Sequence, residues 1–165
     1  MAKENNIYKK ARLDLDLTRE KASDLLEVIP PERIERIENE KFVPHPDEVL
    51  IMSEKYKVPD MVNYYCAKQC PIGEKYVPEI KIKDLSVIVL EMLASLNSMN
   101  DKKERLIEIA VDGVIDDKEI KDFINIQEEL ERISITVETL QLWAEKMIAT
   151  GKINKKLYEE ETNNR

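Results

Sequence analysis

The sequence predicts an all-α protein, and three observations lead to this class. Hydrophobic residues make up 42% of the 165-residue chain and charged residues 36%, a balance typical of a soluble folded protein. The chain holds 3 glycines and 5% aromatic residues, fewer than the turns and strands of β-sandwiches and barrels need. In the second half, apolar residues recur at alternating spacings of three and four, as they do along one side of a helix.

Five short amphipathic helices are expected in the first part of the chain. The first covers residues 7–13, and Thr18 is a good N-cap for the second. Two consecutive prolines must end the second helix, and the latter of them, Pro31, can open the third at its first turn. Pro46 lies at the start of the fourth helix, and Asp60 can cap a fifth.

Four segments follow from the changes of pattern along the chain. Residues 1–70 hold the five short helices. Residues 71–83 contain two prolines and a glycine, and we expect them to form an extended linker between domains. Residues 84–150 are expected to form a long helical hairpin, and residues 151–165 a polar tail.

The hairpin is predicted from two heptad repeats. Lys103 alone interrupts the apolar residues of the first repeat, and nothing interrupts the second. Between the repeats, DGVIDDKE offers Gly113 to reverse the chain and Asp117 to cap the second helix. The first repeat is Leu85, Val89, Met92, Leu96, Met99, Lys103, Leu106 and Ala110, and the second is Phe123, Ile126, Leu130, Ile133, Val137, Leu140, Ala144 and Met147.

The apolar stripe of this hairpin is too broad for one hairpin to cover. Further apolar residues flank both repeats, among them Leu90, Ile107 and Trp143. Two hairpins from two chains would bury the stripe in a four-helix bundle, so a homodimer is expected. The alternative is a monomer whose hairpin folds back on the N-terminal helices. The expected dimer interface is Leu85, Val89, Met92, Leu96, Leu130, Ile133, Val137 and Leu140.

Four motifs in the first 70 residues occur in an informative order. Arg12 precedes LDLDLT, then come LTREKASDLL, PERIERIENEK and DEVLIMSEKYKVPDMVNYY. This series resembles the helix-turn-helix domain of Cro and the phage repressors, the XRE family of regulators, with PERIERIENEK as the recognition helix and its exit. The resemblance implies a five-helix, lambda-repressor-like domain that binds double-stranded DNA. With the expected dimer, it predicts a sequence-specific transcriptional regulator.

The resemblance also implies roles for individual residues. Arg12 and Glu38 would form a partly buried ion pair between the first helix and the recognition helix, which makes Glu38 a framework residue. Arg36 would donate to guanine, and glutamates on the exposed face would accept from cytosine. The implied DNA-binding residues are Arg19, Glu32, Arg33, Glu35, Arg36, Asn39 and Lys41.

Three features depart from the family pattern. The turn between the second and third helices is one residue longer than usual, and Glu27 and Glu40 stand where the family commonly has glycine. The candidate surface mixes carboxylates with cations, so each protomer is expected to bind DNA weakly. Either a dimer on two half-sites compensates for this weakness, or the domain has lost DNA binding and the chain is an adaptor for a protein partner.

No cofactor, metal or catalytic residue is expected. The spacing of Cys66 and Cys70 is open to zinc binding or redox sensing, but ordinary thiols are the preferred interpretation. DGVIDDKE matches part of a calcium-binding loop, yet Ala110 would occupy a ligand position, which favours a plain helix–helix turn. With His45 as the single histidine and no phosphate-binding glycine loop, we expect no enzymatic activity.

The net charge of −8 argues against nonspecific binding to nucleic acid. No stretch has the length and composition of a signal peptide or a membrane span. The sequence therefore predicts a cytoplasmic protein without membrane contact.

Overall fold

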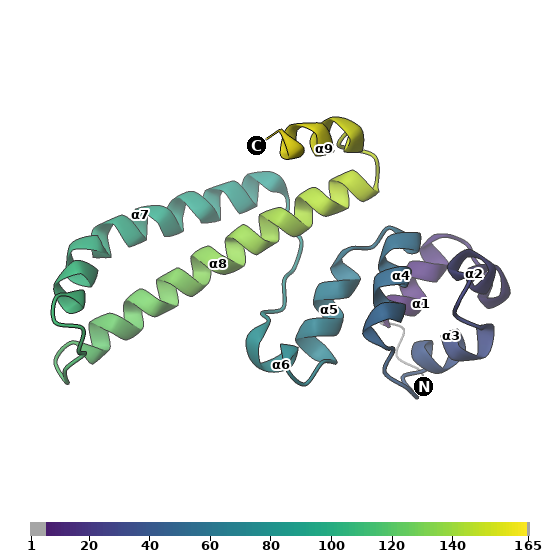
Figure 1. The fold of residues 1–165 in the computed structure, drawn as a ribbon, viewed down its shortest axis with the longest axis horizontal. Coiled ribbons are helices and arrows are strands. Elements are labelled where there is room, and N and C mark those ends of the chain that lie inside the picture. The colour runs from purple at the N-terminus through teal and green to yellow at the C-terminus, as the bar shows by residue number, and fades with distance from the viewer. Residues whose placement is uncertain (1–5, 165) are drawn as a thin grey trace. The chain divides into compact units, whose positions relative to one another are not determined.

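The computed structural model describes residues 6–164, and every regular element in that range is a helix (Figure 1). The predicted all-α class is confirmed for these residues. The chain divides into two compact units, which are described separately. One contains the residues up to Ile80 together with those from Ala144 onward, and the other is Lys81–Trp143. Within the described range, no helix has the length and apolar character needed to cross a membrane.

Five short helices form the first part of the first unit. They are α1 (Ile7–Asp14), α2 (Arg19–Leu26), α3 (Pro31–Glu38), α4 (Pro46–Tyr56) and α5 (Asp60–Lys68). The sequence signals place the starts of these helices to within one residue. One cap was wrong: Pro59 precedes α5, and Asp60, the predicted cap, is its first residue.

Two of these starts have a local chemical cause. The Thr18 side chain accepts a hydrogen bond from the Lys21 N–H and so satisfies one of the unpaired donors at the start of α2. Pro31 is the first residue of α3, where its missing N–H is of no consequence.

The five helices enclose an apolar core. Helix α1 packs on α3 and α4, and α2 packs on the same two helices. Ile34 and Ile37 insert one side of α3 into this core and leave its other side to solvent. The buried cluster is Tyr8, Ala11, Ala22, Leu26, Ile29, Ile34, Ile37, Val49, Met52, Tyr56 and Met61.

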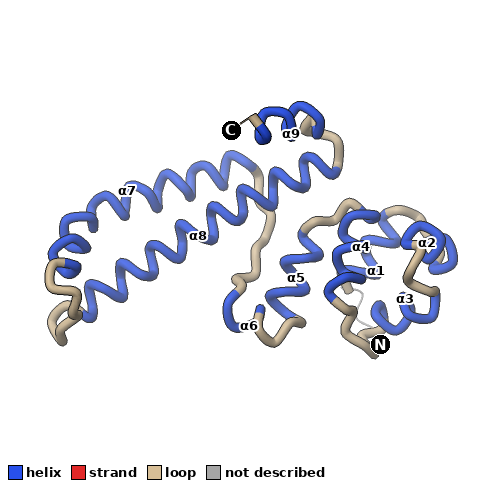
Figure 2. Tube along the Cα trace, viewed as in Figure 1, coloured by secondary structure: helices blue, strands red, loops and turns tan. Residues whose placement is uncertain are grey.

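The segment predicted as an extended linker is instead held against α5 for most of its length. It contains the short helix α6 (Gly73–Tyr76). A Cβ at Gly73 would lie 2.0 Å from the Cys66 carbonyl oxygen, so only glycine permits this close approach. The Asn63 amide donates to the Pro78 carbonyl and accepts from the Ile80 N–H, which fixes the chain beyond α6. The loop that follows leads into the next helix (Figure 2).

The second unit is built on two long antiparallel helices, α7 (Leu85–Ala110) and α8 (Ile120–Ala149), the latter continuing into the first unit (Figure 1). Residues later in α7 contact residues earlier in α8. Ser98 donates to Glu129 at 2.8 Å, and further along Arg105 donates to Asp122 at 2.7 Å. These contacts show that α7 and α8 run antiparallel.

The turn between α7 and α8 differs from the prediction in its cap. Gly113 has a φ of +72°, the left-handed conformation expected where the chain reverses. The cap is Asp116 rather than Asp117, because the Asp116 carboxylate accepts from the N–H groups of Lys118 and Glu119. The Glu119 carboxylate accepts in return from the Asp116 N–H.

Among the described residues buried between the two long helices, Ile126 belongs to a predicted repeat, whereas most of the others precede a repeat residue by one position. We call the buried residues between the helices the inner seam. It contains polar side chains, and the Glu129 carboxylate within it accepts from both Ser98 and Lys102. These bonds satisfy the buried carboxylate. The seam consists of Ile88, Ser95 and Ile109 on α7, and of Ile126, Glu129, Thr136, Thr139 and Leu142 on α8.

Four large apolar repeat residues that follow the inner seam by one position are exposed, whereas Leu140, which follows Thr139, is half-buried. The exposed four are Val89 at 41%, Leu96 at 48%, Leu130 at 45% and Val137 at 40%. A step of one residue rotates the side chain by about 100°, and on two antiparallel helices this rotation is toward the same side of the pair. The four residues therefore share one side of the hairpin, which we call the apolar side. The heptad pattern located the stripe, but it did not determine which edge of the stripe faces the other helix.

The predicted polar tail is mostly helical. Helix α9 covers Lys155–Asn163, and the Asn154 side chain caps it by accepting from the Leu157 N–H. None of its residues is buried, so the segment offered no apolar pattern from which to predict a helix.

Candidate nucleic-acid interface

A buried ion-pair network holds the third helix in place. Glu38, 2% exposed, accepts from Arg12 through both carboxylate oxygens, as the resemblance implied. Arg12 also donates to the Leu17 carbonyl in the turn that leads to α2. The hydrogen bond to Glu38 raises the pKa of Arg12 despite burial, which acts against the charged form. A buried pair satisfied in this way fixes α1, the following turn and α3 relative to one another.

Arg19 joins the same carboxylate from α2. Its Nε donates to Glu38 Oε2 at 3.0 Å, while its side chain remains 33% exposed. The fork geometry of arginine leaves its terminal nitrogens able to donate to a ligand at the start of α2. The network therefore connects α1, α2 and α3, and Arg19 keeps an outward-facing edge.

The outer side of α3 carries the other predicted DNA contacts. Glu32, Glu35 and Arg36 are exposed, and Lys41 is exposed just beyond the helix. The Asn39 amide lies 3.5 Å from a carboxylate oxygen of Glu35, a marginal hydrogen-bond distance. These residues form a continuous solvent-facing strip, opposite the two isoleucines in the core.

Arg33 does not belong with these contacts, which corrects the expectation. Its guanidinium donates to both carboxylate oxygens of Glu48, at 2.8 and 2.7 Å, and weakly to the Val43 carbonyl. Burial raises the pKa of Glu48, but hydrogen bonds from Arg33 and from the His45 N–H outweigh it and lower the pKa below 4.5. Arg33 is a framework residue that ties α3 to the start of α4.

Phe42 is a site residue that sequence reasoning missed. Its ring is 52% exposed, and the guanidinium carbons of Arg33 and Arg36 lie 5.8 and 5.5 Å from the ring centroid. Both distances are within the range of cation–π contacts. The only available signal was an aromatic residue in a polar segment, outside every predicted helix.

Glu27 and Glu40, at the two positions where the resemblance predicts glycine, both have a positive φ. Glu27 has a φ of +65° and ends α2, and Glu40 has a φ of +57° just after α3. Glycine adopts this conformation without the steric cost that a Cβ brings. Both glutamates therefore hold a positive-φ conformation that glycine would adopt at lower steric cost.

The charge of the outer strip is slightly negative. From Glu32 to Lys41, three exposed carboxylates accompany the two exposed cations Arg36 and Lys41. Arg33 and Glu38 are taken up by the framework, so neither alters this balance. The strip therefore offers few cations that could neutralise phosphate charge.

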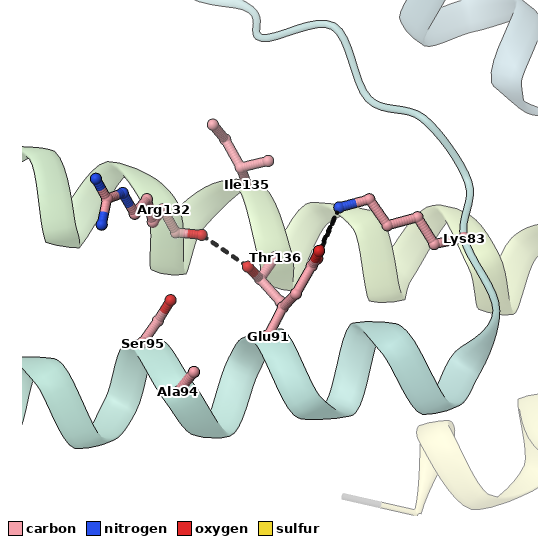
Figure 3. Close-up of a pocket in the computed structure, with 7 residues that line it drawn as sticks. All are labelled: Lys83, Glu91, Ala94, Ser95, Arg132, Ile135 and Thr136. Carbon is pink, nitrogen blue, oxygen red and sulfur yellow. Dashed lines mark hydrogen bonds and ion pairs between the residues drawn. The ribbon is translucent and has the colours of Figure 1, made fainter.

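The side of the hairpin opposite its apolar side holds a cavity of about 350 Å³ (Figure 3). Lys83 and Glu91 at its rim bind each other, and the Thr136 hydroxyl donates to the Arg132 carbonyl. These polar groups therefore bind partners within the cavity lining or on the helix backbone.

Cys66 and Cys70 are half-buried and unbonded to each other. Burial raises the pKa of the Cys66 thiol, which disfavours the thiolate that a metal or an oxidant requires. Among residues 6–164, no group of three or more His, Cys, Asp or Glu side chains is arranged to hold a metal ion.

Comparison of the chain with models of known protein families, with curated proteins and with solved structures gives no match.

Proposed function

We propose that the protein is a homodimeric, sequence-specific DNA-binding regulator of transcription, in which a lambda-repressor-like five-helix domain presents α3 to the major groove. The observation that carries the proposal is the buried network of Arg12, Arg19 and Glu38. It holds three helices together and leaves the side of α3 opposite Ile34 and Ile37 facing outward. A recognition helix requires this combination of a fixed inner side and a free outer side.

Within the strip, each exposed side chain has a chemistry that suits DNA. Arg36 can donate two hydrogen bonds to the O6 and N7 atoms of guanine, and Glu32 or Glu35 can accept from the amino group of cytosine. The outer edge of Arg19 and the Lys41 ammonium can bind phosphates on either side of the groove. Arg33 is left out of the contact set, because Glu48 occupies it.

In this proposal, dimerisation through the hairpin supplies the affinity that one protomer lacks. The apolar side, made of Val89, Leu96, Leu130 and Val137, offers a surface that a second copy can cover in a four-helix bundle. Met92, Ile133 and Leu140 lie half-buried, and Leu85 at the start of α7 is 40% exposed. Once one half-site is occupied, the second contact becomes intramolecular and is favoured by its effective concentration.

The deciding experiment measures binding of the purified full chain to duplex fragments of its own promoter region. Fluorescence anisotropy at about 50 and 200 mM salt should give a complex that weakens steeply with salt. Arg36→Ala should reduce the affinity about 5- to 150-fold, since a bidentate contact to guanine contributes about 1–3 kcal/mol of discrimination. Lys10→Ala, which removes an exposed cation from α1, is the matched control and should bind as the wild type. Absence of an Arg36-dependent complex with any fragment would contradict the proposal.

One observation favours a different function, that of a protein-interaction adaptor. The outer strip of α3 carries more carboxylates than free cations, which disfavours binding to a polyanion. In this case the hairpin holds a defined protein partner through its apolar side. The complex would then survive the double substitution Arg19→Ala with Arg36→Ala and would be lost on Val137→Glu. The DNA-binding proposal predicts instead that the double substitution abolishes regulation.

A further inference from the structure

We propose that Phe42 is a positioning residue that holds the Arg36 guanidinium ready to donate to an acceptor on DNA. This inference rests on the proposed function and deepens it. Phe42 lies outside α3, yet its ring is in contact range of two arginines of that helix. Of the two, Arg33 is bound to Glu48, whereas Arg36 has no carboxylate partner among the described residues.

The backbone brings Phe42 to this place. Helix α3 ends at Glu38, and the left-handed Glu40 turns the chain back along the helix. The N–H groups of Lys41 and Phe42 then donate to the Arg36 carbonyl, at 2.9 and 3.4 Å. Phe42 is thus fixed next to Arg36 by hydrogen bonds that do not depend on either side chain.

The Arg33–Glu48 pair supports the ring from the side of the framework. The Arg33 guanidinium is fixed by two hydrogen bonds to Glu48, and it lies 5.8 Å from the centroid of the Phe42 ring. Val43, the next residue, has its carbonyl within reach of the same guanidinium. The ring therefore packs beside a side chain held by two hydrogen bonds, and Arg36 lies over the ring rather than against a carboxylate.

Such a contact affects binding through preorganisation. A free arginine side chain loses about 2 kcal/mol of rotamer entropy when it is fixed in a complex. Stacking on an aromatic ring restricts the side chain before binding and leaves all five N–H donors free, because the ring takes none of them. A carboxylate partner would hold the side chain equally well but would compete with DNA for the same donors. Phe42 avoids this competition in a region otherwise rich in glutamate.

The test is a double-substitution cycle with promoter DNA in the full chain. Phe42→Leu keeps an apolar side chain but removes the ring, and it should weaken binding about three- to fivefold. Phe42→Tyr should bind as the wild type, and Val43→Ala, at a neighbouring and equally exposed position, is the matched control. In the Arg36→Ala background, Phe42→Leu should have no further effect, since the ring acts through Arg36. Because Phe42 is half exposed, these variants should unfold at the wild-type temperature.

Two further readouts sharpen the result. In the free protein, the Arg36 side-chain protons should show an upfield ring-current shift in the NMR spectrum, which Phe42→Leu removes and Phe42→Tyr retains. Arg36→Ala should either relax preference at one base pair, which identifies guanine as the acceptor, or lower the salt slope by about one, which identifies a phosphate. Both outcomes support an acceptor on DNA.

The outcomes that overturn the inference are distinct from failure of the proposed function. If the effects of Phe42→Leu and Arg36→Ala on binding add, the ring contacts DNA directly and does not act through Arg36. If Phe42→Leu leaves a wild-type complex unchanged, the positioning role is wrong while DNA binding stands. If the wild type binds no promoter fragment, the proposed function and this role are both overturned, even where the ring-current shift is present.

Discussion

The first unit and the hairpin each bury a carboxylate between helices, but they bury their apolar side chains to very different extents. In the first unit, Glu38 lies beside a closed core whose members are almost inaccessible to solvent. In the hairpin, Glu129 occupies the seam itself, and large apolar residues such as Leu96 and Leu130 remain exposed. The difference shows that the first unit completes its core within one chain, whereas the hairpin has an apolar side left to cover.

The largest expected effect tests the first half of this comparison. Glu38→Ala leaves Arg12 buried without its partner, and breaking a buried ion pair in this way costs about 3–5 kcal/mol. Urea denaturation followed by circular dichroism should show this loss in the transition of the first unit. Glu35→Ala, an exposed substitution on the same helix, should leave the transition in place. A loss below about 1 kcal/mol for Glu38→Ala would mean that the network does not hold the helices.

The second prediction tests the exposed apolar side of the hairpin. Leu96→Glu combined with Val137→Glu puts charges on the apolar side, and burying them in a dimer would be unfavourable. Light scattering should give half the wild-type mass, and DNA affinity should fall about a hundredfold, because the second half-site loses its effective concentration. The helical content should not change, since both positions are exposed in the single chain.

The matched control for the hairpin is Leu90→Glu. Leu90 is 67% exposed and follows the buried Ile88 by two positions, so it points away from both α8 and the apolar side. This variant should remain dimeric. A wild-type chain that is monomeric at high micromolar concentration would contradict the expectation for both variants.

A smaller effect is expected at the left-handed Glu40. Glu40→Gly removes the Cβ from a φ of +57° and should stabilise the first unit by about 1 kcal/mol. It also removes a carboxylate from the outer strip, so affinity for DNA should rise. Glu40→Ala separates the two effects, since it removes the charge but keeps the unfavourable conformation. Equal stabilities of the two variants would show that the backbone conformation costs nothing.

The smallest effect concerns pH. The pKa of Glu48 in the folded protein is lowered below 4.5, so the stability that its ionised form contributes is present above that value. This stability is lost as pH falls through the lower, folded pKa. The difference in unfolding free energy between wild type and Glu48→Gln should be about 1 kcal/mol at pH 7 and should vanish once pH has fallen below the lowered, folded pKa. A difference that stays constant over this range would mean that Glu48 acts through packing alone.

The sequence predicted the helices that have local causes. Thr18 and Pro31 mark the starts of α2 and α3 because capping and the proline ring act within a few residues. Helices α6 and α9 were missed, since one depends on contact with α5 and the other buries no residue.

The candidate site was predicted less completely, for a related reason. Arg12 and Glu38 came from a resemblance that carries information about tertiary structure. The pairing of Arg33 with Glu48 and its contact with Phe42 join residues from different segments, and neither spacing nor composition indicates them. In the hairpin, the periodicity predicted the stripe of apolar residues, but it did not predict which side of that stripe faces the other helix.

The shared carboxylate of Glu38 has a consequence for how this sequence can diverge. Because two arginines from different helices depend on one acidic residue, positions 12, 19 and 38 are coupled, and a change at any of them alters the cost of changes at the others. Loss of the acid alone is costly, while replacement of the buried pair by well-packed apolar residues can be neutral. Descendants of this chain should therefore either retain Arg12, Arg19 and Glu38 or exchange all three together. Once the buried pair has been exchanged, Arg19, whose side chain is 33% exposed, should be the first of the three positions to vary freely.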